Sequence, residues 1–292
     1  MRAALIKLLL RLFAGLPLRM AHAMGAIIGT WFVFVPNKLR TITSINIALC
    51  FPGMGKRERV RLMHRSLIET GKTLAEMGAL WFWPKNKMLE LVTQISGEHL
   101  VKEALAQGKG MILAAPHLGA WEVVGLYCSA HYSITSLYRP PRMSALDGMM
   151  RTARQRLGAT LVPTDSQGIR TLYRALEKGE MVGILPDQEP GAGAGVFAPF
   201  FGVPANTMVL MSRLALKTKA PVIFAYAERL PLGSGYHLHF IHVPYTIHEG
   251  SVENSTRCVN AMVEECIRTL PDQYQWSYKR FRSRPAGENH FY

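Results

Sequence analysis

Two residues capable of acid–base chemistry, His117 and Glu122, stand five positions apart near the middle of the chain. His117 follows a short apolar run, and Glu122 lies in the first turns of the helix expected after it. On one helix this spacing would place the two side chains about 140° apart. With His117 in the loop before the helix, we expect them to meet. A carboxylate on one imidazole nitrogen fixes the tautomer and leaves the other nitrogen to take a proton, as a general base for a hydroxyl does.

Short apolar runs bounded by turn residues predict the buried strands that would position this pair. The predicted strands lie at 91–96, 111–115, 181–185, 221–227 and 236–243. The predicted helices lie at 56–83, 86–92, 98–107, 119–129, 144–157, 168–178, 206–218 and 251–270. From about residue 86 onward, we therefore predict one α/β domain with a mostly parallel sheet flanked by helices. Ligands bind at the carboxyl ends of such strands, where His117 and Asp187 are expected to lie.

The N-terminal region combines positive charge with the most apolar stretch of the chain. Residues 1–57 contain no Asp or Glu, and residues 1–65 hold eleven basic residues and one acidic residue. This composition is typical of a segment that seeks an anionic membrane. We predict a membrane anchor over residues 1–40, lying in the interface as an amphipathic helix, and an α/β domain over 41–292. A spanning helix near 16–35, a cleaved signal peptide and a buried helix of a soluble protein are the alternatives.

The net charge of +14 predicts an acidic partner, such as a membrane, a phosphorylated substrate or an acidic protein. Nucleic acid is not predicted, because the basic excess coincides with apolar side chains and no nucleic-acid-binding motif occurs. The GxSxG, GxxxxGK[ST] and GxGxxG motifs are also absent. Four scattered cysteines are interpreted as reduced thiols. His237, His239 and His242 are interpreted as surface or structural residues because no matching carboxylate cluster is apparent, so we predict no metal and no cofactor.

Several blocks, in order along nearly the whole chain, resemble the bacterial lipid A secondary acyltransferases, the lauroyl and myristoyl acyltransferases of lipopolysaccharide synthesis. No single block is specific, but the series is. Besides the basic apolar N-terminus and the His117 and Glu122 pair, the blocks lie at 138–140, 151–156, 185–188, 197–202, 274–276 and 279–285.

The resemblance implies a glycerophosphate-acyltransferase-like α/β fold with an N-terminal hydrophobic helix. It also implies transfer of a fatty acyl chain from acyl carrier protein to a hydroxyl of a hydroxyacyl chain on a lipid A precursor. The implied location is the cytoplasmic face of the bacterial inner membrane, among its lipids. An acyltransferase of the same fold acting on another membrane glycolipid or an aminolipid is the alternative. A further alternative is a membrane scaffold without catalytic activity. The presence of both His117 and Glu122 argues against it.

Within this resemblance, His117 is the expected general base and Glu122 the carboxylate that orients it. Arg139 and Arg154 are expected to bind phosphate or to stabilise developing negative charge, because a guanidinium donates bidentately and stays ionised. Asp187, at the end of a predicted strand, is expected to pair with an arginine or to contact the substrate.

Other residues of these blocks have two interpretations each. The remaining arginines of 139–156 either form a solvated face or dock the acidic carrier protein. Phe197, Phe200 and Phe201 either line an acyl tunnel or belong to the core.

Overall fold

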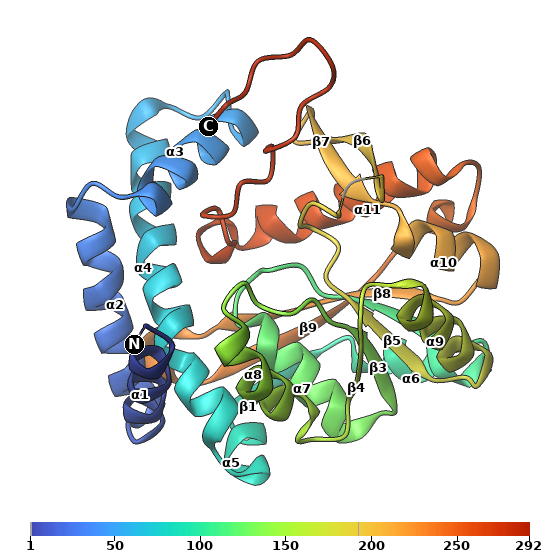
Figure 1. Ribbon diagram of the computed structural model, residues 1–292, viewed down its shortest axis with the longest axis horizontal. Helices are drawn as coiled ribbons and strands as arrows, with labels where there is room; N and C mark the ends of the chain where they lie inside the picture. Colours follow the sequence, from blue (N-terminus) through green and yellow to red (C-terminus); the bar gives the residue numbers. More distant parts are fainter. Residues whose placement is uncertain (1, 192) are drawn as a thin grey trace.

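The computed structural model describes residues 2–191 and 193–292, in which a series of helices over residues 2–89 is followed by a region of mixed helices and strands (Figure 1). The α-helices are α1 (Arg2–Ala14), α2 (Leu18–Phe34), α3 (Lys38–Cys50), α4 (Lys56–Phe82), α5 (Lys85–Leu89), α6 (Glu98–Ala106), α7 (Trp121–His131), α8 (Asp147–Gln155), α9 (Ser166–Glu177), α10 (Leu210–Thr218) and α11 (Val252–Thr269). Short 3₁₀ turns are η1 (Ser144–Leu146), η2 (Pro231–Gly233), η3 (Tyr245–His248) and η4 (Pro271–Gln273).

The strands form one large sheet and one separate hairpin. They are β1 (Val92–Ser96), β2 (Met111–Ala114), β3 (Ile134–Leu137), β4 (Thr160–Val162), β5 (Met181–Ile184), β6 (Gly195–Phe200), β7 (Val203–Met208), β8 (Val222–Arg229) and β9 (Tyr236–His242). The large sheet has the order β1-β9-β8-β2-β5-β3-β4, and β6 pairs with β7. All neighbours in the large sheet are parallel except β8 and β9. The predicted α/β class with a mostly parallel sheet is therefore confirmed.

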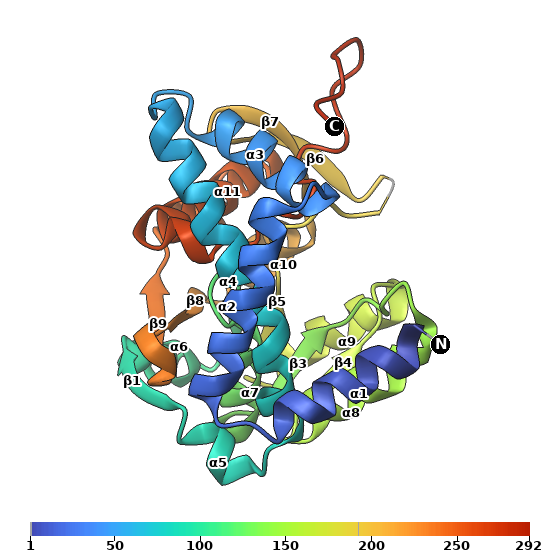
Figure 2. The same ribbon diagram turned by 90° about the vertical axis from the view of Figure 1, so that its left-hand side faces the viewer.

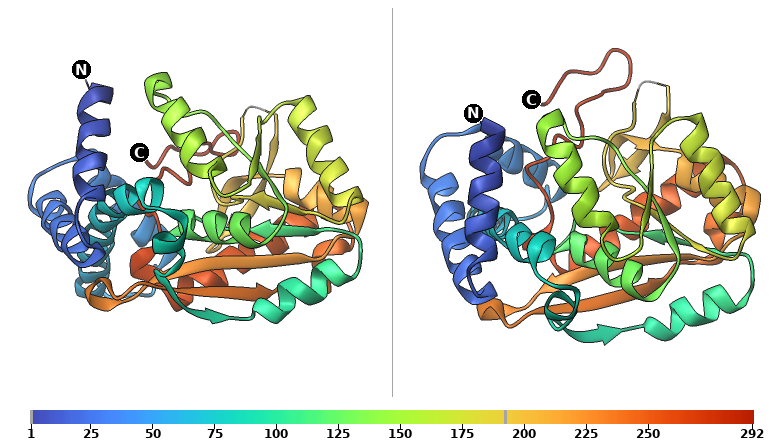
Figure 3. Two further views of the ribbon diagram at one scale, coloured as in Figure 1. Left: turned by 90° about the horizontal axis from the view of Figure 1, so that it is seen from below. Right: turned by 60° about the horizontal axis from the view of Figure 1, so that its bottom comes forward.

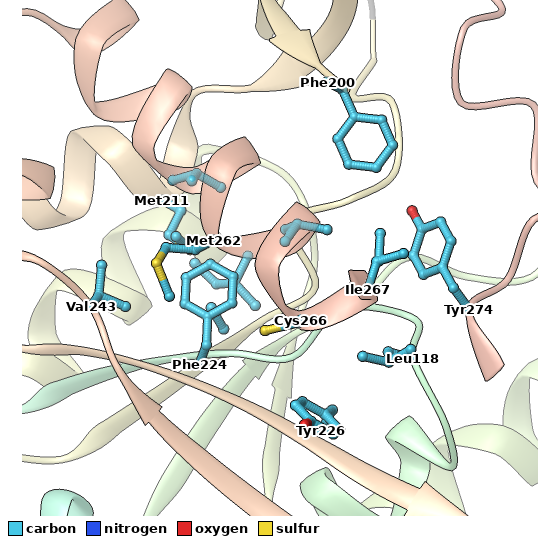
Figure 4. Packing of buried hydrophobic residues seen from close by; sticks show 14 of the residues in the cluster. Leu118, Phe200, Met211, Phe224, Tyr226, Val243, Met262, Cys266, Ile267 and Tyr274 are labelled. Carbon is cyan, nitrogen blue, oxygen red and sulfur yellow. The ribbon is translucent and has the colours of Figure 1, made fainter. Parts of the chain in front are cut away.

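Helices lie on both faces of the large sheet (Figure 3). Side chains that alternate along the central strands bury two apolar layers, one on each face of the sheet. On β2, Ile112 and Ala114 belong to the cluster that contains the apolar face of α11. Met111 and Leu113 belong to the cluster that contains α6 and α7. This two-residue period is that of a strand covered on both sides. Figure 4 shows the layer beneath α11, where Met262 and Phe224 meet.

The N-terminal helices pack against α4 (Figure 2). A Cβ built on Gly25 or Gly29 of α2 would lie 2.6 or 2.4 Å from the backbone of α4, so only glycine lets the two helices approach this closely. Among the described residues, no helix alone is long and apolar enough to cross a membrane. The helices α2 and α3, which are bent by 79° relative to each other, are together long and apolar enough by the same criterion. The spanning or interfacial state of the predicted anchor therefore stays a prediction.

The structure corrects one predicted element and adds others. The helix predicted over 206–218 begins only at Leu210, because residues up to Met208 form β7. Strands β3, β4 and β6 were not predicted. β3 and β4 have only four and three residues, which are too few to show a strand period. β6 contains Pro199 and begins at the end of the glycine-rich run at 191–195, and both obscure its alternation.

Candidate active site

The loop after β2 presents His117 at the carboxyl end of the central sheet. Pro116 follows the strand, and Gly119 adopts a positive φ of 59° that glycine accepts without strain. A Cβ on Gly119 would lie 2.0 Å from the carbonyl oxygen of Ala227 in β8. The backbone of this loop is held further by a bond of 3.0 Å from the Gln275 N–H to the His117 carbonyl. The imidazole therefore projects from a loop whose backbone is fixed on both sides.

Asp187 is the carboxylate that holds His117. Its two oxygens accept hydrogen bonds of 2.8 Å from the ring Nδ1 and of 2.9 Å from the His117 backbone N–H. The Asp187 side chain is 1% exposed and that of His117 is 13% exposed. Burial alone would raise the pKa of Asp187, but the adjacent His117 and these hydrogen bonds hold it below its ordinary value. The acid is therefore ionised against the imidazole.

The second ring nitrogen of His117 is available as an acceptor. Because Nδ1 donates to Asp187, Nε2 carries the lone pair in the neutral ring. The Gln188 amide donates to Nε2 at 3.1 Å and also to the Gln275 Oε1 at 3.1 Å. A polar group thus already occupies the position that a hydroxyl donor would take.

Glu122 does not hold the imidazole, contrary to the sequence-based expectation. Its carboxylate accepts from Arg154, at 3.1 and 3.0 Å from Nε and at a shorter distance from Nη2. The Glu122 side chain is 5% exposed and that of Arg154 is 28% exposed. Burial alone would lower the pKa of Arg154, but Glu122 raises it, so the guanidinium stays ionised. The physical reason for the difference is that Glu122 points from α7 toward Arg154 of α8, whereas Asp187 lies in the loop after β5, the strand next to β2.

A cavity lies between α7 and the sheet, with part of its space open to solvent. Trp121 lines it, and the ring centroid of Trp121 lies 5.1 Å from that of His117. The Glu122 and Arg154 pair contributes polar atoms to the lining, and the rest is mostly apolar. The apolar lining is Leu113, Ala115, Val124, Gly125, Leu126, Ile134, Leu137, Ala159, Leu161, Gly183, Ile184 and Leu185. A mostly apolar lining of this kind suits a hydrocarbon chain.

The other sequence-predicted residues lie elsewhere. Arg139 follows β3 and is exposed. Phe200 and Phe201 belong to the core on the α11 side, and Phe197 is 45% exposed, so none of the three lines the cavity. Of the remaining arginines, Arg156 donates hydrogen bonds to the carbonyls of Leu80 in α4 and of Trp83, the C-cap of that helix. Arg156 therefore holds α4 in place and does not form part of a solvated face.

The C-terminal segment holds the loop that carries Asp187. The buried carboxylate of Glu189 accepts from the backbone and hydroxyl of Ser283 and from Arg282. The Tyr278 hydroxyl accepts from the Glu189 N–H at 2.9 Å. The arginine-rich block at 279–285 therefore has a positioning role that its charge alone did not indicate.

Gln188, Gln275 and Trp121 are site residues that sequence reasoning missed. Each belongs to a block that carried the family resemblance or stands beside His117 in the chain. That position was the available signal. Nothing in the residue types of a glutamine or a tryptophan indicated contact with the imidazole.

Comparisons with known proteins identify the family of the chain. The sequence model described as bacterial lipid A biosynthesis acyltransferase matches residues 2–283. The chain is 28% identical to the lipid A biosynthesis lauroyltransferase of Escherichia coli (strain K12), over 93% of this chain and 88% of that protein. It is 27% identical to the lipid A biosynthesis palmitoleoyltransferase of the same strain, over 96% and 91%. The lipid A biosynthesis myristoyltransferase of that strain is 24% identical, over 84% and 75%.

Proposed function

Because the chain belongs to the bacterial lipid A biosynthesis acyltransferase family, we propose that it transfers a fatty acyl chain from an acyl-carrier-protein thioester to a hydroxyl of a hydroxyacyl chain on a lipid A precursor. The observation that carries this proposal is the imidazole of His117, oriented by a buried carboxylate, beside an apolar cavity. The relatives named for lauroyl, palmitoleoyl and myristoyl transfer support a long fatty acid as the group transferred.

In the proposed reaction, the acceptor hydroxyl replaces the Gln188 amide at Nε2 of His117. Nε2 takes the hydroxyl proton as the oxygen attacks the thioester carbonyl, and Asp187 stabilises the imidazolium that forms. The carbon–sulfur bond then breaks, and the leaving thiolate receives that proton. The products are an ester and the free thiol of the carrier, and His117 returns to its neutral form.

The pair of Glu122 and Arg154 has a different role in this proposal. A guanidinium has five N–H donors, and Arg154 uses Nε and Nη2 on Glu122. Glu122 thereby fixes the plane of Arg154 at the cavity lining. The remaining donors of Arg154 are then the groups we assign to the negative charge that develops on the thioester oxygen.

The cavity beside Trp121 is the proposed site of the donor acyl chain. It places an acyl carbonyl near His117 while the methylenes lie between α7 and the sheet. Burial of each methylene stabilises binding by about 0.8 kcal/mol, so the end of the cavity selects chain length. The exposed Arg139 and Arg142 follow β3, which lines this cavity, and their charge suits the acidic carrier protein or a lipid phosphate.

We assign the N-terminal helices to the membrane surface. α1 and α2 expose large apolar side chains, including Leu12 at 60%, Ile27 at 71%, Trp31 at 63% and Phe34 at 75%. Basic residues such as Arg19 are exposed beside them. Apolar insertion together with attraction to anionic headgroups favours an interfacial location on the cytoplasmic face of the inner membrane, where both the carrier protein and the lipid A precursor are available.

Mass spectrometry of a reconstituted reaction tests the proposal. Purified tetra-acylated lipid A precursor is incubated with acyl carrier protein carrying a C12 or C14 chain, with wild type and His117→Ala compared as folded proteins in detergent. We expect one added acyl mass with wild type and none with the variant. No added mass with either donor would move the assignment to another membrane glycolipid or aminolipid as acceptor. An added mass that survives in His117→Ala would contradict the proposed base.

A further inference from the structure

Two histidines and a glutamate from neighbouring strands converge on the sheet, away from His117. His237 and His239 stand two residues apart on β9, so their side chains share one face. Glu228 of β8 lies directly opposite His237 in the antiparallel register. The nearer Glu228 oxygen is 3.1 Å from Nε2 of His239 and 4.0 Å from Nδ1 of His237. The three candidate ligand atoms all lie within 4.8 Å of one another.

We propose that Glu228, His237 and His239 bind a divalent transition metal ion of the zinc type, with water completing the coordination. Zinc binds nitrogen and oxygen at 2.0–2.2 Å in tetrahedral geometry, which sets ligand atoms about 3.4 Å apart. The observed separations lie on both sides of that value, so small side-chain rotations close the site. Two imidazoles with one carboxylate favour zinc over magnesium or calcium, which prefer oxygen ligands alone.

Contacts around the triad hold both imidazoles in place. The Ser96 hydroxyl is 2.8 Å from Nε2 of His237, the ring nitrogen that does not face Glu228. The Tyr226 ring stacks on His239 with centroids 4.6 Å apart and an angle of 21°. The Tyr226 hydroxyl is itself 3.1 Å from Thr269 at the end of α11. Outer contacts of this kind orient the ligands of metal sites.

The electrostatics of the triad also favour a cation. Among the residues that the structure describes, the ion pairs of Glu228 are with these two histidines. The imidazole centroids are 3.8 Å apart, so two protonated rings would repel each other. Neutral imidazole is the form that binds metals, and a bound ion would replace the missing positive charge beside Glu228.

The triad is separate from the proposed acyltransfer site. Tyr226, which stacks on His239, belongs to the α11 side of the sheet, whereas the apolar cavity lies on the α7 side. The side chains of His237, His239 and Glu228 are 20%, 20% and 33% exposed, so an ion can enter from solvent. From the sequence, the histidines are interpreted as surface or structural residues because no matching carboxylate cluster is apparent. The carboxylate of Glu228 comes from the neighbouring strand β8, which local spacing does not reveal. This inference replaces that interpretation and does not rest on the proposed function.

Isothermal titration calorimetry with ZnCl₂ tests the site. The full chain, in detergent and without an affinity tag, is first stripped with a chelator. We expect one equivalent of zinc to bind to wild type and to bind at least about tenfold more weakly to His239→Gln and to Glu228→Gln. The matched control is His242→Gln, because His242 ends the same strand but lies on its other face. Its affinity is expected to equal that of wild type.

Bound Co²⁺ provides an independent readout, because its visible absorption reports tetrahedral nitrogen and oxygen ligands. We expect this absorption in wild type and His242→Gln and its loss in Glu228→Gln, whose shape is almost unchanged. If His239→Gln fails to fold, as judged by circular dichroism, the Glu228→Gln variant alone tests whether the three residues bind the metal. Zinc binding that is absent in wild type, or that is equally strong in Glu228→Gln, would overturn the proposal. Displacement of zinc by a tenfold excess of Mg²⁺ would overturn it as well.

Discussion

Among the residues that the structure describes, His22 and His117 each pair with an almost fully buried carboxylate, and the surroundings of the two pairs differ. His22 of α2 lies 3.0 Å from Glu76 of α4, and His117 lies 2.8 Å from Asp187. The distances are nearly equal, and each carboxylate is almost fully buried. By distance and burial alone, both pairs would qualify as a general base and its orienting acid.

The surroundings separate the two pairs. Glu76 also accepts from Nε and Nη2 of Arg229, each at 2.7 Å, and from the Tyr236 hydroxyl at 3.0 Å. Burial would raise the pKa of Glu76, but Arg229 lowers it to about 2. The Glu76 carboxylate thus binds His22, Arg229 and Tyr236, and the network links α2 and α4 to β8 and β9. A histidine and carboxylate pair is therefore a candidate base only where the second ring nitrogen faces a site that a substrate can reach.

The largest expected effect comes from removing the two histidines in turn. His117→Gln is expected to lower the rate of acyl transfer by about 10²–10⁴-fold while leaving the thermal unfolding temperature nearly unchanged. His22→Gln is expected to leave the rate of acyl transfer nearly unchanged and to lower the free energy of unfolding by about 1–3 kcal/mol. The reason is that the buried Glu76 carboxylate loses a hydrogen bond. Rates and unfolding curves of the same preparations provide the check. Equal loss of activity in both variants would remove the distinction between the pairs.

Glu76→Gln is expected to lower the free energy of unfolding by about 3–5 kcal/mol at neutral pH, because Arg229 loses a buried counterion. The folded pKa of Glu76, about 2, lies below its ordinary value of 4.5. The stability from its charge is therefore present above pH 4.5 and is lost as the pH falls through about 2. Unfolding measured from pH 7 downward is expected to show a gap between wild type and variant that narrows only below about pH 4.5. A gap independent of pH over that window would contradict this account.

A smaller effect is expected on chain-length selection. Gly125 of α7 lines the cavity, and a Cβ built on it has nothing within 4 Å. Gly125→Leu is therefore expected to fill the cavity without strain and to shift preference toward shorter acyl chains, by about fourfold for each methylene excluded. Competition between C10, C12 and C14 donors measures the shift. Gly148→Leu is the matched control, because Gly148 in α8 has equal free space and is outside the cavity lining. The same shift in both variants would contradict the assignment of the cavity.

Much of the fold was predictable because strands buried on both faces are continuous apolar runs. The predicted strands at 111–115 and 181–185 correspond closely to β2 and β5. The β6 and β7 hairpin was missed because Val203–Met208 contains a proline and an asparagine and leads directly into α10. Such a stretch shows neither a strand period nor a clear break before the helix.

Some members of the site were predictable from the sequence, but their pairing was not, and Gln188, Gln275 and Trp121 were missed. His117, Glu122, Arg154 and Asp187 were all selected from the sequence, and the structure places all four at the end of the sheet or the lining of its cavity. Sequence spacing favoured His117 with Glu122, because they are five residues apart. The observed pairing depends on β5 lying next to β2 in the sheet, although Asp187 is 70 residues from His117. Strand order is a property of the whole fold, and local spacing carries no information about it.

The most direct test of the central claim is the dependence of single-turnover acyl transfer on pH in wild type, Asp187→Asn and Glu122→Gln. In the proposed mechanism the rate is expected to fall on the acid side, because a protonated His117 cannot accept the hydroxyl proton. If Asp187 stabilises the imidazolium, Asp187→Asn is expected to shift that fall to lower pH and to slow the reaction at every pH. Glu122→Gln is expected to slow the reaction and to leave the position of the fall unchanged. A shift produced by Glu122→Gln and not by Asp187→Asn would contradict the account and restore Glu122 as the partner of His117.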